Sequence, residues 1–384
     1  MKKSSFRDKD VKKRKRIIVS VTNDLATDQR VKRFCGTLHS GGYDILLTGR
    51  ILPRSLPVDD RPYEIRRVKH WFNKGAMFYA EYNLRLLFFL LSERYDILHS
   101  NDLDTLPASF LASRIRKKTL IYDSHEYFTE VPELSGRKMV KKIWETIERL
   151  ILPRLDHIIT VSDSIAAEYR DKYGKHVETI RNVPEKTSAR HSFPPSHYGL
   201  PAGKKLVILQ GSGINRDRGA EEAVSSMEFV KEAVLVIAGD GDILPQLREQ
   251  VIKRKLNEKV VFVPPLPYSE LMHLTGLCDA GLSLDRDTNL NYRYSLPNKL
   301  FDYITAGIPV VVSPLPEVRA IVEKYKIGLI IADHSPAEIA KTINSILFKI
   351  PGPYWHENLK KASDELNWEN EKQKLLDVYT GSVS

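Results

Sequence analysis

Short runs of Ile, Val and Leu alternate along the chain with longer amphipathic segments. The runs have almost no polar positions, as expected of strands that are buried on both faces of a parallel sheet. The amphipathic segments Gln29–His39, Thr105–Arg116, Lys138–Leu152 and Leu244–Lys255 repeat their apolar residues at helical spacing. This alternation predicts an α/β fold of doubly wound parallel sheets covered by helices. The predicted strands are residues 17–22, 44–48, 96–100, 119–123, 157–162, 205–210, 233–238, 260–263, 279–284, 309–312 and 328–331.

The pattern stops between residues 182 and 204, where Pro184, Pro194, Pro195 and Pro201 gather. We interpret this stretch as the connection between two Rossmann-like domains, which the length of 384 residues accommodates. Ligands of open parallel sheets bind at the carboxyl ends of the strands, so two such sheets facing each other predict a central cleft. The predicted parts are a basic flexible tail (1–15), an N-terminal Rossmann-like domain (16–185), a linker (186–203), a C-terminal Rossmann-like domain (204–365) and a C-terminal helix (366–384).

The net charge of +10 is concentrated at one end of the chain, because residues 1–16 hold nine basic side chains against two acidic ones. The body is therefore nearly neutral, which argues against nucleic acid as a partner. The tail is either a solvated terminus or an electrostatic hold on anionic lipid, and peripheral membrane association stays open. Two distant cysteines, Cys35 and Cys278, fit a reducing compartment. The longest apolar run, 86–91, is too short to span a bilayer, so we expect a cytoplasmic protein, with the inner face of the cytoplasmic membrane left open.

The segment 295–311 carries the strongest chemical signal. Ser295 is a good N-cap and Pro297 suits a first helical turn, while Gly307 is suited to end the helix. Free amides at such a helix start, with Lys299 beside them, predict a phosphate site. Asp302, one turn later, is suited to accept hydrogen bonds from ribose hydroxyls. An ordinary capped helix with a solvated lysine is the alternative.

A second signal is the Gly-rich loop 210–219, between a predicted strand and helix. Gly211, Ser212 and Gly213 allow close backbone approach, and the Arg218 guanidinium can bind two phosphate oxygens at once. The loop is neither a P-loop nor a dinucleotide-binding fingerprint, so a plain tight turn also fits it.

Taken together, these segments resemble the GT-B glycosyltransferases of the retaining family 4 type, over nearly the whole chain. The block Leu296–Val311 resembles that family's Pro-x-Lys, acid and Ala-Gly-x-Pro-Val pattern, and Ala238–Gly241 its glycine turn. Asn23–Arg30 resembles the N-terminal loop of a bacterial subgroup. Asp123–Glu126 resembles the strand-end segment that holds the active-site histidine.

The resemblance implies a hexosyltransferase that uses a UDP- or GDP-linked sugar and needs neither a cofactor nor a metal ion. A glycan or lipid-linked acceptor would take the sugar, as in polysaccharide biosynthesis. The implied catalytic residues are His125, Arg218 and Lys299, with His125 across the cleft near the donor sugar, accepting from a hydroxyl or helping to orient the acceptor. The stretch with Trp368 and Glu369 resembles the family's return of the chain onto the first domain. The implied donor-binding residues are Gly211, Ser212, Gly213, Arg218, Ser295, Asn298, Lys299 and Asp302.

The first domain is then expected to bind the acceptor. Candidates near its strand ends are Asp28, Arg30, Asn101, Asp102 and Glu126, although Asp28 and Arg30 also fit a helix cap and first turn. We expect no metal at the Asp-x-Asp triplets 102–104 and 285–287, and read Asp104 as a helix cap. The aromatic and basic segments 79–91 and 138–149 are either core-facing helices or a face suited to lipid-linked acceptors.

Two positions depart from the family pattern. Ser212 stands where many members have a diphosphate-binding arginine, and Tyr294 where an acid contacts the donor sugar. Two alternatives therefore stay open: a non-catalytic nucleotide-sugar-binding subunit, and a GT-B sugar-nucleotide epimerase. The epimerase would need more acids and histidines in the cleft than the sequence offers.

Overall fold

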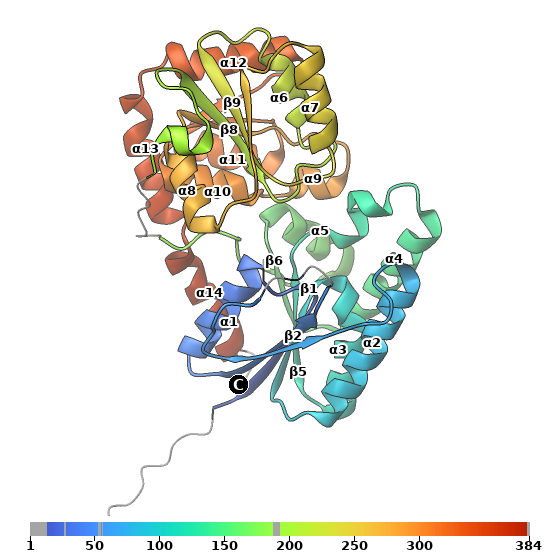
Figure 1. The fold of residues 1–384 in the computed structure, drawn as a ribbon. Coiled ribbons are helices and arrows are strands. Elements are labelled where there is room, and N and C mark those ends of the chain that lie inside the picture. Colours follow the sequence, from blue (N-terminus) through green and yellow to red (C-terminus); the bar gives the residue numbers. More distant parts are fainter. Residues whose placement is uncertain (1–13, 27, 53–54, 56, 187–192, 382–384) are drawn as a thin grey trace, which may run out of the picture.

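Two α/β domains make up the part of the chain that the computed structural model describes, residues 14–26, 28–52, 55, 57–186 and 193–381 (Figure 1). Each domain is one parallel sheet with helices on both faces. The first sheet has the strand order β3-β2-β1-β4-β5-β6-β7 and the second β10-β9-β8-β11-β12-β13. Most of the predicted basic tail and residues 187–192 of the predicted linker lie outside the described residues.

The elements of the first domain follow one another as strand and helix. Its strands are β1 (Arg16–Asp24), β2 (Asp44–Arg50), β3 (Glu64–Val68), β4 (Ile97–Asn101), β5 (Thr119–Ser124), β6 (His157–Thr160) and β7 (Glu178–Thr179). Its helices are α1 (Gln29–Ser40), α2 (Gly75–Ser92), α3 (Asp102–Arg116), α4 (Lys138–Ile151) and α5 (Asp163–Tyr173), with short 3-10 turns η1 (Phe128–Glu130), η2 (Pro132–Leu134) and η3 (Leu152–Arg154).

The second domain repeats this arrangement after the 3-10 turn η4 (Pro195–Tyr198). Its strands are β8 (Lys205–Gly211), β9 (Ala233–Gly239), β10 (Val260–Val263), β11 (Ala280–Ser283), β12 (Val310–Val312) and β13 (Gly328–Ile330). Its helices are α6 (Ala220–Ser226), α7 (Leu244–Lys253), α8 (Tyr268–Gly276), α9 (Leu290–Tyr294), α10 (Asn298–Ala306), α11 (Pro316–Tyr325), α12 (Pro336–Phe348) and α13 (Pro353–Glu365), and α14 (Trp368–Gly381) closes the chain.

The predicted α/β fold with two Rossmann-like domains is confirmed, and every predicted strand is present. The pattern missed β3 and β7, which are the two edge strands of the first sheet. β3 is only partly buried and three of its five residues are charged, and β7 has two residues. Edge strands bury less surface, so they lack the continuous apolar run by which the central strands are identified.

Alternate residues of the central strands face two different helix layers. Ile17 and Val19 of β1 belong to the core on the α1 side, whereas Ile18 belongs to the core beneath α2 and α3. α14 crosses from the second domain and lies beside α1 (Figure 1). There the ring of Trp368 stacks on Phe34 with centroids 5.4 Å apart.

Among the helices of the described residues, none combines the length and apolar character that crossing a membrane requires.

Candidate functional site

The loop between β8 and α6 is held in place by close backbone packing. Gly219 has φ +79°, and a Cβ there would lie 2.3 Å from the backbone oxygen of Leu284, so only glycine fits. The adjoining loop after β9 is tied on, because the Ile214 amide donates to the Asp240 carbonyl at 2.8 Å. Ser212 and Gly213 remain exposed at the carboxyl end of the sheet. Because Arg218 directly precedes Gly219, this packing fixes the position of the Arg218 backbone.

Arg218 and Lys299 converge on one buried carboxylate, Asp285. Arg218 Nη1 lies 2.9 Å from Asp285 Oδ1, and Lys299 Nζ lies 3.3 Å from Oδ2. The guanidinium also lies over the ring of Tyr292, 4.2 Å from its centroid. Burial lowers the pKa of Lys299, while the two cations hold the pKa of Asp285 below its usual range although burial opposes them. Two cations thus face one acid, which leaves an excess positive charge.

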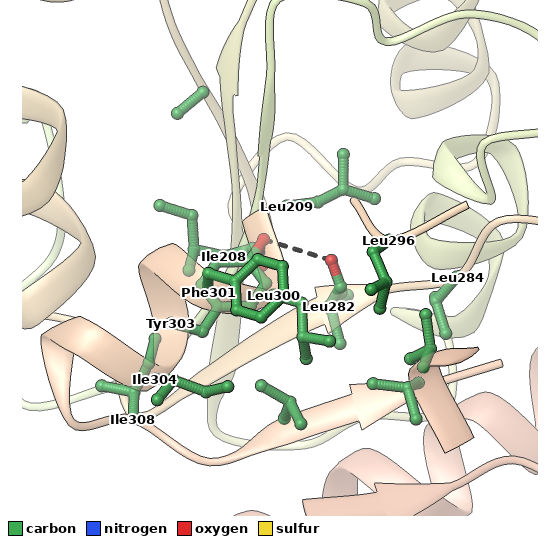
Figure 2. Close-up of a cluster of buried hydrophobic side chains, with 14 of the residues drawn as sticks. Ile208, Leu209, Leu282, Leu284, Leu296, Leu300, Phe301, Tyr303, Ile304 and Ile308 are labelled. Carbon is green, nitrogen blue, oxygen red and sulfur yellow. Dashed lines mark hydrogen bonds between the residues drawn. The ribbon is translucent and has the colours of Figure 1, made fainter. Parts of the chain in front are cut away.

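Helix α10 is fixed to the sheet by Tyr303 (Figure 2). The buried Tyr303 hydroxyl donates toward the carbonyls of Ile208, at 3.2 Å, and Leu282, at 3.1 Å. Its ring occupies the space over Gly281, where a Cβ would lie 2.4 Å from the ring. The Tyr303 side chain, which contacts strands β8 and β11, therefore determines how far α10 lies from the sheet. This distance in turn sets the positions of Lys299 and Asp302.

Asp302 is buried and accepts two hydrogen bonds. Gln210 Nε2 donates to Oδ2 at 3.0 Å and the Tyr268 hydroxyl to Oδ1 at 2.8 Å. Burial raises the pKa of Asp302 to about 6, and the two donors and Arg33 of the first domain moderate the rise. Each oxygen keeps a free lone pair, so the carboxylate can still accept from a ligand hydroxyl.

In the first domain, His125 follows β5 and lies among acceptors. Its Nε2 is 2.9 Å from Asn101 Oδ1 and 3.1 Å from Asp123 Oδ2, and its Nδ1 is 3.5 Å from Asp102 Oδ2. Burial alone would lower the pKa of His125, but the carboxylates of Asp102 and Asp123 outweigh it and raise the pKa to about 9. The imidazole is therefore a cation at neutral pH, with both nitrogens acting as donors.

Asp102 holds an unusual backbone conformation, with φ +57°. Its Oδ1 accepts from the His125 amide at 2.9 Å, which joins the ends of the neighbouring strands β4 and β5. Burial raises the pKa of Asp102 to about 7 and that of Asp104 to about 6. A left-handed backbone conformation costs free energy in any residue other than glycine, and such strain is concentrated at functional sites.

The two domains meet at the loop that follows His125. The Tyr127 amide donates to Asn291 Oδ1 at 2.9 Å, and Asn291 Nδ2 donates to Glu126 at 3.2 Å. Asn291 precedes Tyr292, on which Arg218 rests. Through this buried asparagine the histidine side and the cation side of the candidate site are brought together.

A second contact between the domains joins Asn182, just after β7, to the start of α10. Asn182 Nδ2 donates to Asn298 Oδ1 at 2.8 Å, and Arg33 of α1 donates to Asn182 Oδ1. A third contact between the domains involves Tyr294. Its hydroxyl donates to Glu168 at 3.0 Å, and its carbonyl accepts from Ser162 at 2.8 Å.

The predicted acceptor-side residues Asp28, Arg30, Asn101 and Glu126 are engaged with other groups of the protein. Asp28 caps α1, accepting from the Val31 amide at 2.9 Å. Arg30 is buried against Asp123, and Asn101 is buried between its histidine contact and the Ser20 carbonyl, to which it donates at 2.9 Å. Glu126 is exposed beside Asn291.

Two predicted caps were wrong. Ser295 ends α9, donating to the Tyr292 carbonyl at 2.9 Å, and α10 begins only at Asn298. Asp104 lies within the first turn of α3 and accepts from Thr22, whereas the helix begins at Asp102. Ser295 instead bonds to the helix that precedes it, and Asp104 bonds to a residue of strand β1. The local sequence pattern reveals neither contact.

The sequence pattern also passed over Asp123, Gln210, Tyr268, Asn291 and Tyr292. Each acts through a partner distant in the chain, so no local spacing identifies it. The described residues contain no group of three or more His, Cys, Asp or Glu side chains arranged to hold a metal ion.

Two family models match the chain in succession. Residues 28–183 match the model described as Glycosyltransferase Family 4, and residues 198–351 the model described as Glycosyl transferases group 1. The chain is a glycosyltransferase of the GT-B fold. Its enzyme class is that of the nucleotide-sugar-dependent glycosyltransferases, and the matched ranges correspond to its two domains.

Known proteins resemble this glycosyltransferase over most of their length. An uncharacterized glycosyltransferase of Methanocaldococcus jannaschii is 23% identical over 88% of each chain. The chitobiosyldiphosphodolichol beta-mannosyltransferase of Yarrowia lipolytica is 20% identical, over 92% of this chain and 83% of the other. The structure of Anabaena HepE in complex with UDP-glucose superimposes with a TM-score of 0.73 and 14% identity, covering 96% of this chain and 100% of the other.

Proposed function

We propose that this glycosyltransferase transfers a hexose from a UDP- or GDP-linked sugar to a glycan or lipid-linked acceptor, with retention of configuration and without a metal ion. The observation that carries the proposal is the convergence of Arg218 and Lys299 on Asp285. Two fixed cations with one carboxylate leave positive charge that a diphosphate would neutralise. Supporting it, the loop of His125 reaches the same place through Asn291.

We assign donor binding to the second domain. The loop 211–213 follows β8, and its residues Ser212 and Gly213 are exposed. Ser295 lies before α10 and Asn298 at its start. The backbone amides of the loop and these two residues would donate to phosphate oxygens. Asp302 would accept from the ribose, since its oxygens keep lone pairs beside Tyr268 and Gln210. Burial of Lys299 keeps its charge poorly solvated, which strengthens its attraction for an anion.

In the transfer step the bond from the anomeric carbon to the diphosphate oxygen breaks, and the acceptor hydroxyl oxygen forms the new bond on the same face. The diphosphate leaves with the bonding electron pair, and the hydroxyl proton passes to a leaving-group oxygen. Arg218 and Lys299 compensate the charge that develops on the leaving group. His125 is charged at neutral pH and both its nitrogens face acceptors of the protein, so it would act on the leaving group through its positive charge rather than accept a proton.

The acceptor and location are argued from relatives. The Yarrowia relative is named for an acceptor joined by diphosphate to a dolichol lipid, which supports a lipid-linked acceptor here. The HepE structure, solved with UDP-glucose, supports a UDP-linked donor. We therefore propose a cytoplasmic enzyme working at the inner face of the cytoplasmic membrane, without cofactor or nucleic acid.

A second candidate is a nucleotide-sugar-binding subunit without turnover. The observation that favours it is Tyr294, which stands at the position of the family's sugar-contacting acid and is engaged with Glu168 and Ser162 of the other domain. In this candidate the donor binds but the sugar is not transferred.

Donor hydrolysis by the purified protein tests both candidates. A panel of UDP-, GDP- and other nucleotide sugars is incubated with EDTA, and released nucleotide is measured. Slow release from one donor is expected, and the anomeric proton coupling of the product then reports retention or inversion. Thermal stabilisation by one donor without release, even with lipid-linked acceptors, would favour the binding subunit. No release and no stabilisation by any donor would refute the diphosphate site.

A further inference from the structure

Nine large apolar side chains lie exposed on three neighbouring helices of the first domain. α3 packs against both α2 and α4, and the three helices cover the same face of the sheet (Figure 1). Their exposed fractions run from 39% to 82%. In the described residues of the second domain, by contrast, no helix exposes more than one such side chain. The nine are Met77, Leu84 and Phe88 of α2, Leu111 and Ile115 of α3, and Met139, Val140, Ile143 and Leu150 of α4.

These residues recur at helical spacing on outward faces. Leu84 and Phe88, and likewise Leu111 and Ile115, are four residues apart, so each pair lies on one side of its helix. The inner sides are occupied by buried residues such as Tyr82 and Leu86. The helices therefore have apolar surfaces on both sides, one in the core and one facing solvent. We call the nine exposed side chains the outer apolar face.

Exposed cations accompany this face on α4. Lys138, Lys142 and Arg149 are exposed between and beside the apolar positions. Of the acids on α4, Glu148 is buried and accepts from Lys172 at 2.7 Å, and Glu145 lies 3.9 Å from Lys141. The outer apolar face therefore carries net positive charge along one edge.

We propose that the outer apolar face docks on an anionic lipid bilayer. Apolar side chains at the interface with cations beside them match the acyl boundary and the anionic headgroups of such a bilayer. A second copy of this chain fits less well, because a twofold contact would bring the same cations together. The basic tail is a separate element of the sequence, and the docking argued here does not depend on it or on the transfer reaction.

The bound surface is joined directly to the candidate site. Trp144 of α4 packs edge-on against Phe128, with ring centroids 5.2 Å apart, and Glu148 accepts from Thr129 at 3.5 Å. Phe128 and Thr129 belong to η1, which begins three residues after His125. Docking through α4 thus holds the His125 loop near the membrane surface, on the side from which a lipid-linked molecule would arrive.

Vesicle flotation with the full chain tests the proposal. One variant carries Leu84→Gln, Phe88→Gln, Ile115→Gln and Ile143→Gln. The control carries Phe229→Gln, Ile252→Gln and Phe348→Gln, which are exposed to a similar degree on the second domain. On vesicles of phosphatidylcholine with phosphatidylglycerol, we expect the first variant to lose partitioning by about tenfold or more and the control to match the unaltered chain.

A charge variant separates the two contributions. Lys138→Gln, Lys142→Gln and Arg149→Gln together should reduce binding to the anionic vesicles by about tenfold or more, and leave binding to pure phosphatidylcholine unchanged. The thermal midpoint of each variant is measured first, because exposed substitutions should leave it unaltered.

Three results would overturn the proposal. The first is vesicle binding by the apolar variant that equals the binding of the unaltered chain. If added salt abolishes that remaining binding, the basic tail is responsible for it. Equal losses in the apolar variant and the control are another. The third is a dimer in sedimentation equilibrium that the apolar variant dissociates, together with no vesicle binding by the unaltered chain.

Discussion

The guanidinium of Arg30 binds both carboxylate oxygens of Asp123, with Nε 3.0 Å from Oδ2 and Nη2 2.7 Å from Oδ1. Both side chains are almost fully buried. Although burial opposes it, Arg30 together with His125 holds the pKa of Asp123 well below its usual range. The pair joins the start of α1 to the end of β5 and keeps an ionised carboxylate beneath His125.

We expect Arg30→Ala to lower the free energy of unfolding by about 3 to 5 kcal/mol, because the buried Asp123 carboxylate would lose both hydrogen bonds from the guanidinium and be left with His125 as its cationic partner. Chemical denaturation measures this. Lys32→Ala on the same helix is the control, since its exposed pair with Asp59 should contribute less than about 1 kcal/mol. A similar loss of unfolding free energy in the two variants would mean that the buried pair contributes no more to stability than the exposed pair.

Arg218→Ala should weaken nucleotide binding by about 2 to 3 kcal/mol and slow transfer as well, because a charged hydrogen-bond donor to the diphosphate is lost. Calorimetry with the donor identified by hydrolysis measures the affinity. Arg286→Ala, which removes an exposed pair with Glu222 nearby, should leave it unchanged. Equal affinity in Arg218→Ala and the unaltered chain would remove Arg218 from the site.

Binding of the nucleotide sugar should weaken as the pH falls through about 6. The pKa of Asp302 is raised to about 6 by burial, so below that pH the protonated carboxyl loses acceptor strength toward the ribose. Asp302→Asn should weaken binding at pH 7 and abolish this pH dependence. His125→Ala, on the other domain, should retain binding of the bare nucleotide. An unaltered pH profile in Asp302→Asn would contradict the ribose role.

Asp102→Asn should lower the pKa of His125 from about 9, because one of the two carboxylates that raise it is neutralised. Imidazole proton shifts, assigned with His125→Gln, measure this titration by NMR. Since the folded pKa lies above the ordinary 6.5, the contribution of His125 to the unfolding free energy is complete below pH 6.5 and is lost as pH rises through 9. The same titration in both proteins would exclude Asp102 as the cause.

Gly281→Ala should destabilise the second domain by about 1 to 3 kcal/mol, since the new Cβ would overlap the ring of Tyr303. Thermal unfolding measures the loss. Gly276→Ala, at a position with open space around it, is the matched control. A harmless Gly281→Ala would show that α10 can shift without cost.

The sequence by itself predicted the two parallel sheets, because strands buried on both faces carry an unbroken apolar run. It also predicted the helix that carries Lys299 and Asp302, because Gly307 ends it in the left-handed conformation at φ +76°. Such signals are local: each lies within a dozen residues and reports the backbone conformation or burial of that segment.

Only the tertiary structure decided which charges meet. Asp285 binds cations 67 and 14 residues away in the chain, and Asn291 joins two domains across 164 residues. Arg30 was a candidate for acceptor binding, yet it lies buried against a carboxylate 93 residues distant. Pairing of this kind depends on three-dimensional proximity and on the cost of burying a lone charge, and neither leaves a periodic pattern along the chain.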